Sequence, residues 1–275
     1  MGECNTCPSG ETCSKDKATC MLEYNSLSNV KKIIGVMSGK GGVGKSTVSA
    51  LLAKHLSEEG YKVGVLDADI TGPSIPRLLG VSKEKVMVTD NVMYPAKTKD
   101  NISVMSLNLL MDESQPVIWR GPMIAGVVKQ FWTDTYWAEL DYLIIDMPPG
   151  TGDVALTVMQ TIPIDGVVMV SIPQDMVSMI VSKAVSMAKQ MNINIYGVVE
   201  NMSYIKCPDC DKRIKLFSDE ETDKFLEGMD LELLGELPMV KSVSGLEKNT
   251  DKRLDKDVKE VMENIASKIL QKATN

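Results

Sequence analysis

The chain has 275 residues, 44% of them hydrophobic and 24% charged, and its formal net charge at pH 7 is -7. This length accommodates one substantial α/β domain with a short appendage. The negative charge argues against a general affinity for nucleic acid or for an anionic membrane, so we expect no nucleic acid and no membrane among the partners.

The first 30 residues are predicted to form a Cys-rich arm, followed by one domain at residues 31–275. The arm is polar and shows neither helical nor strand periodicity. It lacks the basic and apolar regions of a signal peptide, and no apolar run in the chain approaches the roughly 20 residues that cross a bilayer. We therefore expect a cytoplasmic protein, in a compartment where cysteines stay reduced.

From residue 31 onward, short apolar segments alternate with helix-length segments. Strands are predicted at 33–37, 63–66, 142–145, 166–171, 196–199 and 233–237. Helices are predicted at 46–59, 153–161, 176–191 and 255–273, the last with one apolar face that we expect to dock on the core. Near-continuous apolar strands separated by helices indicate an α/β fold with a parallel sheet covered on both faces.

A glycine-rich turn, GKGGVGKST, follows the first predicted strand. It satisfies the pattern G-x-x-x-x-G-K-S between a strand and a helix, which is the context that a phosphate-binding P-loop requires. Glycines let successive N–H groups face the phosphates, and the helix N-terminus adds the positive end of its dipole. Lys45 is expected to reach the β and γ phosphates, and the Ser46 hydroxyl to ligate magnesium. The predicted nucleotide-binding residues of the turn are Gly39, Lys40, Gly41, Gly42, Val43, Gly44, Lys45, Ser46 and Thr47.

Polar side chains follow three of the predicted strands. Asp67 and Asp69 stand at the end of a buried strand, where parallel-sheet proteins place their ligands. Asp69 is a catalytic candidate for orienting the attacking water and Asp67 a candidate for the magnesium site, although one of them could merely cap the next segment. Asp146 ends a strand of Walker B form and is expected to hold magnesium through its water shell. Asn201 is a candidate for a hydrogen bond to the adenine, or a simple turn residue.

The six cysteines fall into two groups. Cys207 and Cys210 form a Cys-x-x-Cys knuckle, a spacing that lets two thiolates bind one metal or cluster. Two ligands do not complete a site, so the knuckle is a redox pair, half of a zinc site, or a thiol pair used across a symmetry axis. The other four have the spacing C-x2-C-x5-C-x6-C, which indicates a second cluster, zinc or an unmetallated arm, and they are Cys4, Cys7, Cys13 and Cys20.

Five segments together resemble the Mrp/Nbp/ApbC family. They are GKGGVGKST at 39–47, LDADITGPSIP at 66–76, WRGPM at 119–123, DMPPGTGD at 146–153 and VENMSYIKCPDC at 199–210. The resemblance implies a homodimeric ATPase that carries [4Fe-4S] clusters to apo iron-sulfur client proteins, with the bridging cluster held by Cys207 and Cys210 of each subunit. The arm resembles the ferredoxin-like segment of cytosolic Nbp scaffolds, but Cys20 follows its trio of cysteines, whereas in those proteins the fourth cysteine precedes the trio.

Lys40 is similar to the early lysine of deviant Walker A loops. In that class the early lysine reaches across a dimer to the partner's nucleotide. The similarity implies that Lys40 is a catalytic residue acting in trans, alongside Lys45 and Asp69, and supplies the charge that an arginine finger supplies elsewhere. The expected bound groups are ATP, Mg²⁺ and a [4Fe-4S] cluster, with zinc as an occupant in isolated samples.

Three other protein classes share parts of this pattern. A MinD- or ParA-like positioning ATPase has the same loop, but it has no use for a cysteine knuckle, and its basic tail or surface is not evident here. A nitrogenase-reductase-like electron donor couples the same fold to a bridging cluster, but through cysteines that lie far apart in sequence. A zinc-stabilised nucleotide switch would bind nucleotide without turnover, and its zinc content would identify it.

Overall fold

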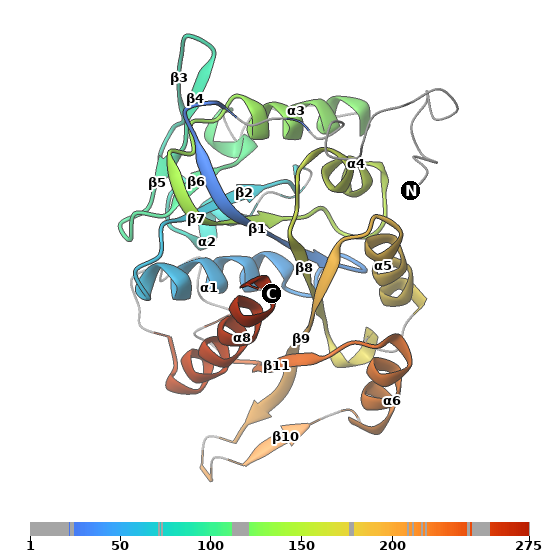
Figure 1. Cartoon of the computed structure of the whole chain (residues 1–275). Helices are drawn as coiled ribbons and strands as arrows, with labels where there is room; N and C mark the ends of the chain where they lie inside the picture. The colour runs from blue at the N-terminus through green and yellow to red at the C-terminus, as the bar shows by residue number, and fades with distance from the viewer. Residues whose placement is uncertain are drawn as a thin grey trace, which may run out of the picture.

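The computed structural model describes residues 22, 25–70, 72, 74–111, 121–175, 179–207, 209–210, 212–215, 217, 219–240, 243 and 254–274 (Figure 1). The strands are β1 (Asn29–Ser38), β2 (Val63–Asp67), β3 (Met87–Thr89), β4 (Val92–Tyr94), β5 (Ala96–Lys97), β6 (Ser103–Met105), β7 (Glu139–Asp146), β8 (Gly166–Ser171), β9 (Asn194–Lys206), β10 (Arg213–Lys215) and β11 (Leu233–Pro238). The helices are α1 (Lys45–Glu58), α2 (Ile75–Leu78), α3 (Gly121–Thr133), α4 (Asp153–Thr161), α5 (Met179–Gln190), α6 (Asp219–Met229) and α8 (Lys256–Thr274), with short 3-10 turns η2 (Leu107–Leu109) and η3 (Pro173–Asp175).

One central sheet has the strand order β10-β9-β8-β1-β7-β2-β6-β5, and β11 pairs with β9 beside this path. The pairs that join β9, β8, β1, β7, β2 and β6 are all parallel, as is the pair of β11 with β9. The predicted α/β fold with a parallel sheet is therefore confirmed. The short strands β5 and β10 add antiparallel pairs at the margins. Both were missed because two or three residues carry no apolar run.

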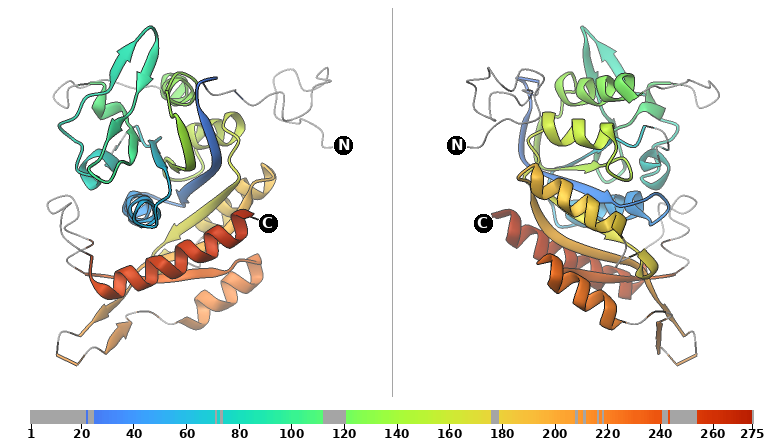
Figure 2. Two further views of the ribbon diagram at one scale, coloured as in Figure 1. Left: turned by 60° about the vertical axis from the view of Figure 1, so that its left-hand side comes forward. Right: turned by 90° about the vertical axis from the view of Figure 1, so that its right-hand side faces the viewer.

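The sheet separates two hydrophobic cores. Ile34 and Val36 of β1 face the core formed with α1, α2 and α8. Ile33 and Met37 of the same strand face the core formed with α3, α4, α5 and α6, and Figure 2 shows these four helices following one another along one side. Because successive strand residues point to opposite faces, a continuous apolar strand fills both cores. The expected docking of the last helix is confirmed, since Ile265 of α8 is fully buried.

The strand predicted at 196–199 extends through Lys206, which corrects the prediction that Asn201 follows a strand end. Asn201 lies inside β9. This strand pairs with β8 as far as Glu200, with β11 from Val198 to Tyr204 and with β10 from Tyr204 to Lys206. The extra ladder partners keep the chain extended through a polar stretch that has no strand pattern of its own.

The N-terminal part of the described chain is fastened at the end where α3 and α4 lie. The Leu22 N–H donates to the Thr161 carbonyl at 3.0 Å, and the Trp132 indole N–H donates to the Leu22 carbonyl at 2.9 Å. The arm cysteines predicted as cluster ligands, Cys4, Cys7, Cys13 and Cys20, lie outside the described residues. Within the described part of the chain, none of the helices combines the length and the apolar character needed to cross a bilayer.

Candidate nucleotide site and cysteine knuckle

The glycine-rich turn leads from β1 into α1, as the motif predicts. Gly42 and Gly44 both have a φ of 83°, in the left-handed region that favours glycine. A Cβ atom at Gly41 or Gly42 would meet no other atom within 4 Å, so the backbone there is open to a ligand. At the end of the turn, α1 begins with Lys45, which directs its first N–H groups toward this opening. The turn thus has the form of a phosphate cradle.

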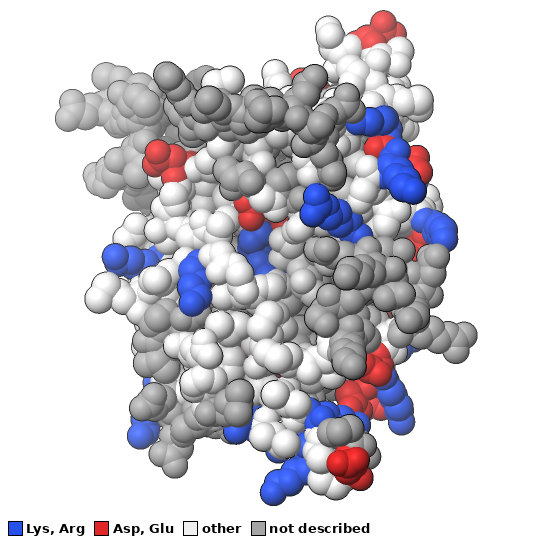
Figure 3. Space-filling view, turned by 180° about the vertical axis from the view of Figure 1, so that it is seen from behind, with Lys and Arg blue, Asp and Glu red and all other residues white. Residues whose placement is uncertain are grey.

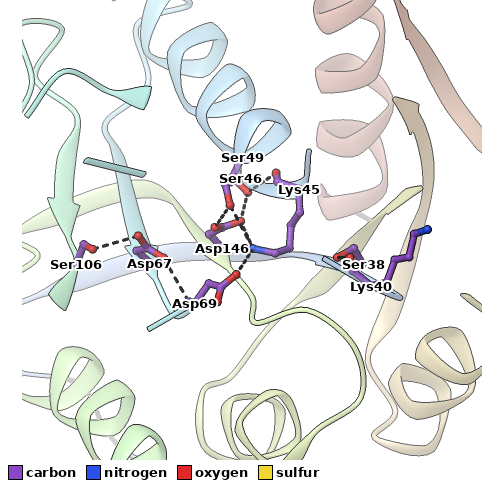
Figure 4. A network of polar contacts seen from close by, with 9 residues as sticks. All are labelled: Ser38, Lys40, Lys45, Ser46, Ser49, Asp67, Asp69, Ser106 and Asp146. Carbon is purple, nitrogen blue, oxygen red and sulfur yellow. Dashed lines mark hydrogen bonds and ion pairs between the residues drawn. The ribbon is translucent and has the colours of Figure 1, made fainter. Parts of the chain in front are cut away.

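Asp146, at the end of β7, is the centre of the polar network in Figure 4. Its Oδ1 lies 2.9 Å from the Lys45 Nζ and accepts a hydrogen bond from the Ser49 hydroxyl at 2.8 Å. Its Oδ2 accepts a hydrogen bond from the Ser46 hydroxyl at 2.6 Å. The carboxylate is fully buried, and an ammonium group with two hydroxyls offsets the cost of removing it from water. Ser49, one turn after Lys45 and two residues beyond the motif, was not predicted.

Asp67 and Asp69 extend this network from the end of β2. The Asp69 carboxylate lies 3.6 Å from the Lys45 Nζ, so the lysine is shared between two acidic strand ends. Asp67 accepts the Asp69 N–H at 3.2 Å and the Ser106 hydroxyl at 3.1 Å. Burial raises the pKa of Asp67 well above its usual range, and the nearby Asp146 carboxylate raises it further, whereas Lys45 and the Ser106 hydrogen bond lower it. Ser106 is a second unpredicted member of the site.

The loop after β7 lies directly against the P-loop. The Gly150 N–H donates to the Ser38 carbonyl at 2.9 Å, and Gly150 has a φ of 79°. The Ser38 hydroxyl in turn donates to the Lys40 carbonyl at 2.8 Å. The Lys40 side chain is exposed and extends away from Lys45 and Asp146 in Figure 4. The two lysines of the motif therefore face different directions.

Asn201 fastens the P-loop from the side. Its amide nitrogen donates to the Val43 carbonyl at 2.9 Å, and the residue is 2% exposed. This bond is a structural tie within the protein, and the predicted contact with the adenine stays a prediction. Asn201 also limits what can stand at Gly44, because a Cβ atom there would lie 2.1 Å from the Asn201 amide nitrogen.

Replacing Gly44 with Ala is expected to lower both the melting temperature and the nucleotide affinity. The left-handed φ alone costs roughly 1–2 kcal/mol for a residue with a Cβ, and each kcal/mol lowers the melting temperature by about 2–4 °C in a protein of this size. The clash with Asn201 adds to this cost. Gly41→Ala is the matched control for stability, because a Cβ atom at Gly41 meets no protein atom within 4 Å. Equal effects of the two substitutions in thermal unfolding without nucleotide would contradict this account.

Cys207 and Cys210 lie at the turn between β9 and β10. The Cys207 N–H donates to the Lys212 carbonyl at 2.9 Å, which closes the turn. Cys207 is partly buried, Cys210 is exposed, and neither is in a disulfide. Within the described part of the chain, no three His, Cys, Asp or Glu residues are grouped so that they could hold a metal ion. The knuckle therefore offers two sulfur ligands at the surface.

Charge on the molecular surface is mixed. On the face shown in Figure 3, the described Lys and Arg side chains are dispersed among uncharged and acidic ones. Several basic side chains on the molecule are paired with carboxylates, for example Lys31 with Asp141 at 2.8 Å. Binding to phosphate backbones depends on several cationic groups acting together, and the face in Figure 3 does not gather them.

Comparison with known proteins identifies the family. A sequence profile described as "NUBPL iron-transfer P-loop NTPase" matches residues 29–274. The chain belongs to this family. The resemblance to the Mrp/Nbp/ApbC carriers drawn from the motifs is confirmed at the family level. Among curated relatives of this NUBPL-type NTPase is an "Iron-sulfur cluster carrier protein" from Clostridium perfringens, 52% identical over 87% of this chain and 89% of the relative. A protein of the same description from Methanocaldococcus jannaschii is 42% identical over 98% of this chain and 97% of its own length.

Solved structures agree with the family assignment. A nucleotide-binding protein from Archaeoglobus fulgidus, in complex with ADP, aligns with this NUBPL-type NTPase at a TM-score of 0.70 and 42% identity, over 85% of this chain and 88% of that chain. The cell division ATPase MinD from Pyrococcus furiosus aligns at a TM-score of 0.63 over 87% of this chain and 98% of that chain, with 21% identity. The likeness to MinD shows a shared fold and no more.

Proposed function

We propose that this protein binds and hydrolyses ATP and uses the nucleotide to control a [4Fe-4S] cluster, which it carries to apo iron-sulfur client proteins. The observation that carries the proposal is the combination, in an iron-transfer family, of a P-loop site centred on Lys45 and Asp146 with a surface knuckle of two cysteines that are not in disulfides. Each thiolate pair is half of the four-sulfur set that such a cluster requires. The proposed setting is the cytoplasm.

The oxygen atoms of the site fit a magnesium ion. Mg²⁺ prefers oxygen ligands and binds nucleotide phosphates through one or two protein side chains. The Ser46 hydroxyl lies 2.6 Å from the Asp146 carboxylate, and we assign these two groups to the magnesium site. Asp67 is the third candidate for this site. Bound Mg²⁺ would neutralise charge on the phosphates. In the proposed cycle Lys45 moves from the Asp146 carboxylate to the incoming phosphates, and Asp69 then accepts a hydrogen bond from the attacking water.

Two copies of the chain are proposed to share the cluster. A two-fold axis near the knuckles would bring Cys207 and Cys210 together with the same pair of the partner subunit and so complete four ligands. The exposed apolar side chains Ile205 and Ile214, which face each other across β9 and β10, border the knuckle and suit burial between two copies. A further site on the arm cysteines stays a prediction.

Lys40→Gln is expected to slow ATP hydrolysis by about 10³ while ATP affinity changes little, because a trans-acting cation stabilises the transition state more than the bound nucleotide. Turnover and nucleotide titration measure the two effects separately. Mixing a Lys40→Gln subunit with a Lys45→Gln subunit makes the test specific. A dimer of the two has one site with an intact Lys45 facing an intact Lys40, so the mixture should recover activity. Normal turnover of Lys40→Gln, or a mixture as inactive as its parts, would contradict trans action.

Anaerobic reconstitution with iron and sulfide tests the whole proposal. Iron, sulfide and zinc are measured per dimer, and the loaded protein is then mixed with an apo iron-sulfur protein whose activity reports cluster arrival. The proposal expects about four irons per dimer at the knuckles, together with transfer that depends on nucleotide. Zinc that reconstitution does not displace would favour the zinc-stabilised nucleotide switch instead. ATP turnover with no iron bound would favour a positioning ATPase.

A further inference from the structure

One strand connects the nucleotide site to the knuckle. Asn201 of β9 donates its amide to the Val43 carbonyl of the P-loop, and Cys207 follows six positions later, directly after the strand ends. At about 3.3 Å per residue, the two points are roughly 20 Å apart along the strand. Figure 1 shows β9 crossing the molecule toward β10 without a break. Movement of the P-loop at Val43 would therefore act on β9, the strand that also positions the thiols.

The strand changes conformation between these two points. Met202 has a φ of 56°, which is unusual for a residue with a side chain and is retained only where the surroundings enforce it. The register of the β11 pair also shifts here, between Glu236 and Pro238. An irregularity in a ladder changes the direction and twist of the strand beyond it. Met202 thus marks a point at which β9 can redirect the segment that carries Cys207.

Ser203, the next residue, holds two carboxyl groups together. Its hydroxyl lies 2.6 Å from the Glu200 Oε2 and 2.8 Å from the Glu236 Oε1. A serine hydroxyl has one hydrogen to donate, so Ser203 can donate to only one of these two carboxyl groups at a time. Glu236 also lies 2.5 Å from the Lys215 ammonium. Glu200 is 3% exposed, and burial raises its pKa, whereas the hydrogen bond from Ser203 lowers it.

This buried group reaches the strand on the other side of the knuckle. Lys215 belongs to β10, whose pairing with β9 forms the hairpin that ends in Cys207 and Cys210. The ion pair between Lys215 and Glu236 therefore ties the far side of the hairpin to β11. Lys206, the last residue of β9, makes a second tie to Asp257 of α8 at 2.6 Å. The hairpin is held from both of its strands.

We propose that Asn201, Ser203 and Lys215 are positioning residues that transmit nucleotide-driven movement of the P-loop to the thiols of Cys207 and Cys210. The inference rests on the proposed function and adds its route inside one subunit. Nucleotide binding alters the loop at Val43, Asn201 moves with that carbonyl, and the Ser203 network transfers the movement to the hairpin. Thermodynamic linkage requires that a change at the thiols alters nucleotide affinity by the same factor.

Thiol alkylation of the reduced, cluster-free full chain tests the route. The rates of reaction of Cys207 and Cys210 with iodoacetamide are measured by mass spectrometry, with and without a non-hydrolysable ATP analogue. The wild-type rates are expected to change at least about fivefold, the lower end of ordinary coupling between two sites. In Ser203→Ala, the ratio of the alkylation rates with and without the analogue should be close to one. The affinity of this variant for the analogue should stay near that of the wild type. An unresponsive wild type, or an undiminished ratio in Ser203→Ala, overturns the proposal.

Further variants separate transmission from loss of structure. Glu200→Gln keeps a hydrogen-bonding side chain of the same size beside Ser203 and should retain the nucleotide response, whereas Glu200→Ala removes the contact and should lose it. Lys215→Met changes a partly exposed side chain, so it tests the hairpin end of the route with little risk to folding. Equal responses in Glu200→Gln and Glu200→Ala would overturn the route through Ser203.

Association of subunits is controlled by dilution. If the thiols are protected from alkylation only because they are buried between two copies, the protection depends on protein concentration and is the same in Ser203→Ala as in the wild type. That result would also overturn the route. Iron bound per dimer is measured in parallel. If iron is bound and is lost in the Cys207→Ala/Cys210→Ala variant, the proposed function stands even where the alkylation ratio shows no transmission.

Discussion

Lys45→Gln is expected to lower the affinity for ATP and ADP by about 100-fold or more. The loss corresponds to roughly 3 kcal/mol, the contribution of a charge-assisted contact with phosphate. Lys45 is 6% exposed and lies between the carboxylates of Asp146 and Asp69. Without its ammonium group, the carboxylates of two acidic strand ends face the phosphates with no lysine between them. Isothermal titration of the purified variant measures the effect.

The matched control is Lys40→Gln, since it removes the other lysine of the same loop. Lys40 is exposed and extends away from the network, so its loss should leave nucleotide affinity close to that of the wild type. Lys45→Gln also removes the cation beside the buried Asp146, and thermal unfolding without nucleotide therefore monitors folding. A folded Lys45→Gln protein with wild-type affinity, or equal losses in the two variants, would show that Lys45 is not the phosphate ligand.

The Cys207→Ala/Cys210→Ala variant is expected to lose the bridging cluster completely, a loss of about four irons per dimer after anaerobic reconstitution. The knuckle is a surface turn closed by the backbone bond from Cys207 to Lys212. Neither thiol fills space in a hydrophobic core, so the variant with two alanines should still fold and bind nucleotide. Iron and sulfide analysis together with the visible absorption spectrum measures the effect.

The matched control for the knuckle is Cys4→Ala/Cys7→Ala, which removes the same number of thiols from the arm. If the arm holds a second site, this variant loses a separate portion of the metal and retains the bridging cluster. Iron that survives in the knuckle variant and disappears in the arm variant would refute the assignment of Cys207 and Cys210 as ligands. Zinc analysis of the same samples shows whether a lost metal was iron.

Local chemistry explains why the P-loop could be predicted from sequence. A strand, a glycine-rich turn and a helix are consecutive, and the turn needs residues that tolerate a φ of 83° at Gly42 and Gly44. The predicted strands also form the parallel sheet, because apolar runs buried on both faces have few other arrangements. The two-thiol knuckle is likewise visible from spacing alone. In the phosphate loop and in the knuckle, the interacting residues are close in sequence.

The tertiary structure decided which distant side chains complete the site. Ser49 reaches Asp146 across 97 positions, and Ser106 reaches Asp67 across 39. Neither serine has a local pattern that distinguishes it from other polar residues, since its partner is determined by which strands lie side by side. The same holds for Asn201, whose bond to Val43 spans 158 positions and depends on β9 continuing past its apolar segment. Sequence by itself determined the phosphate loop, the sheet and the thiol pair, whereas only the pairing of strands determined how β9 connects them.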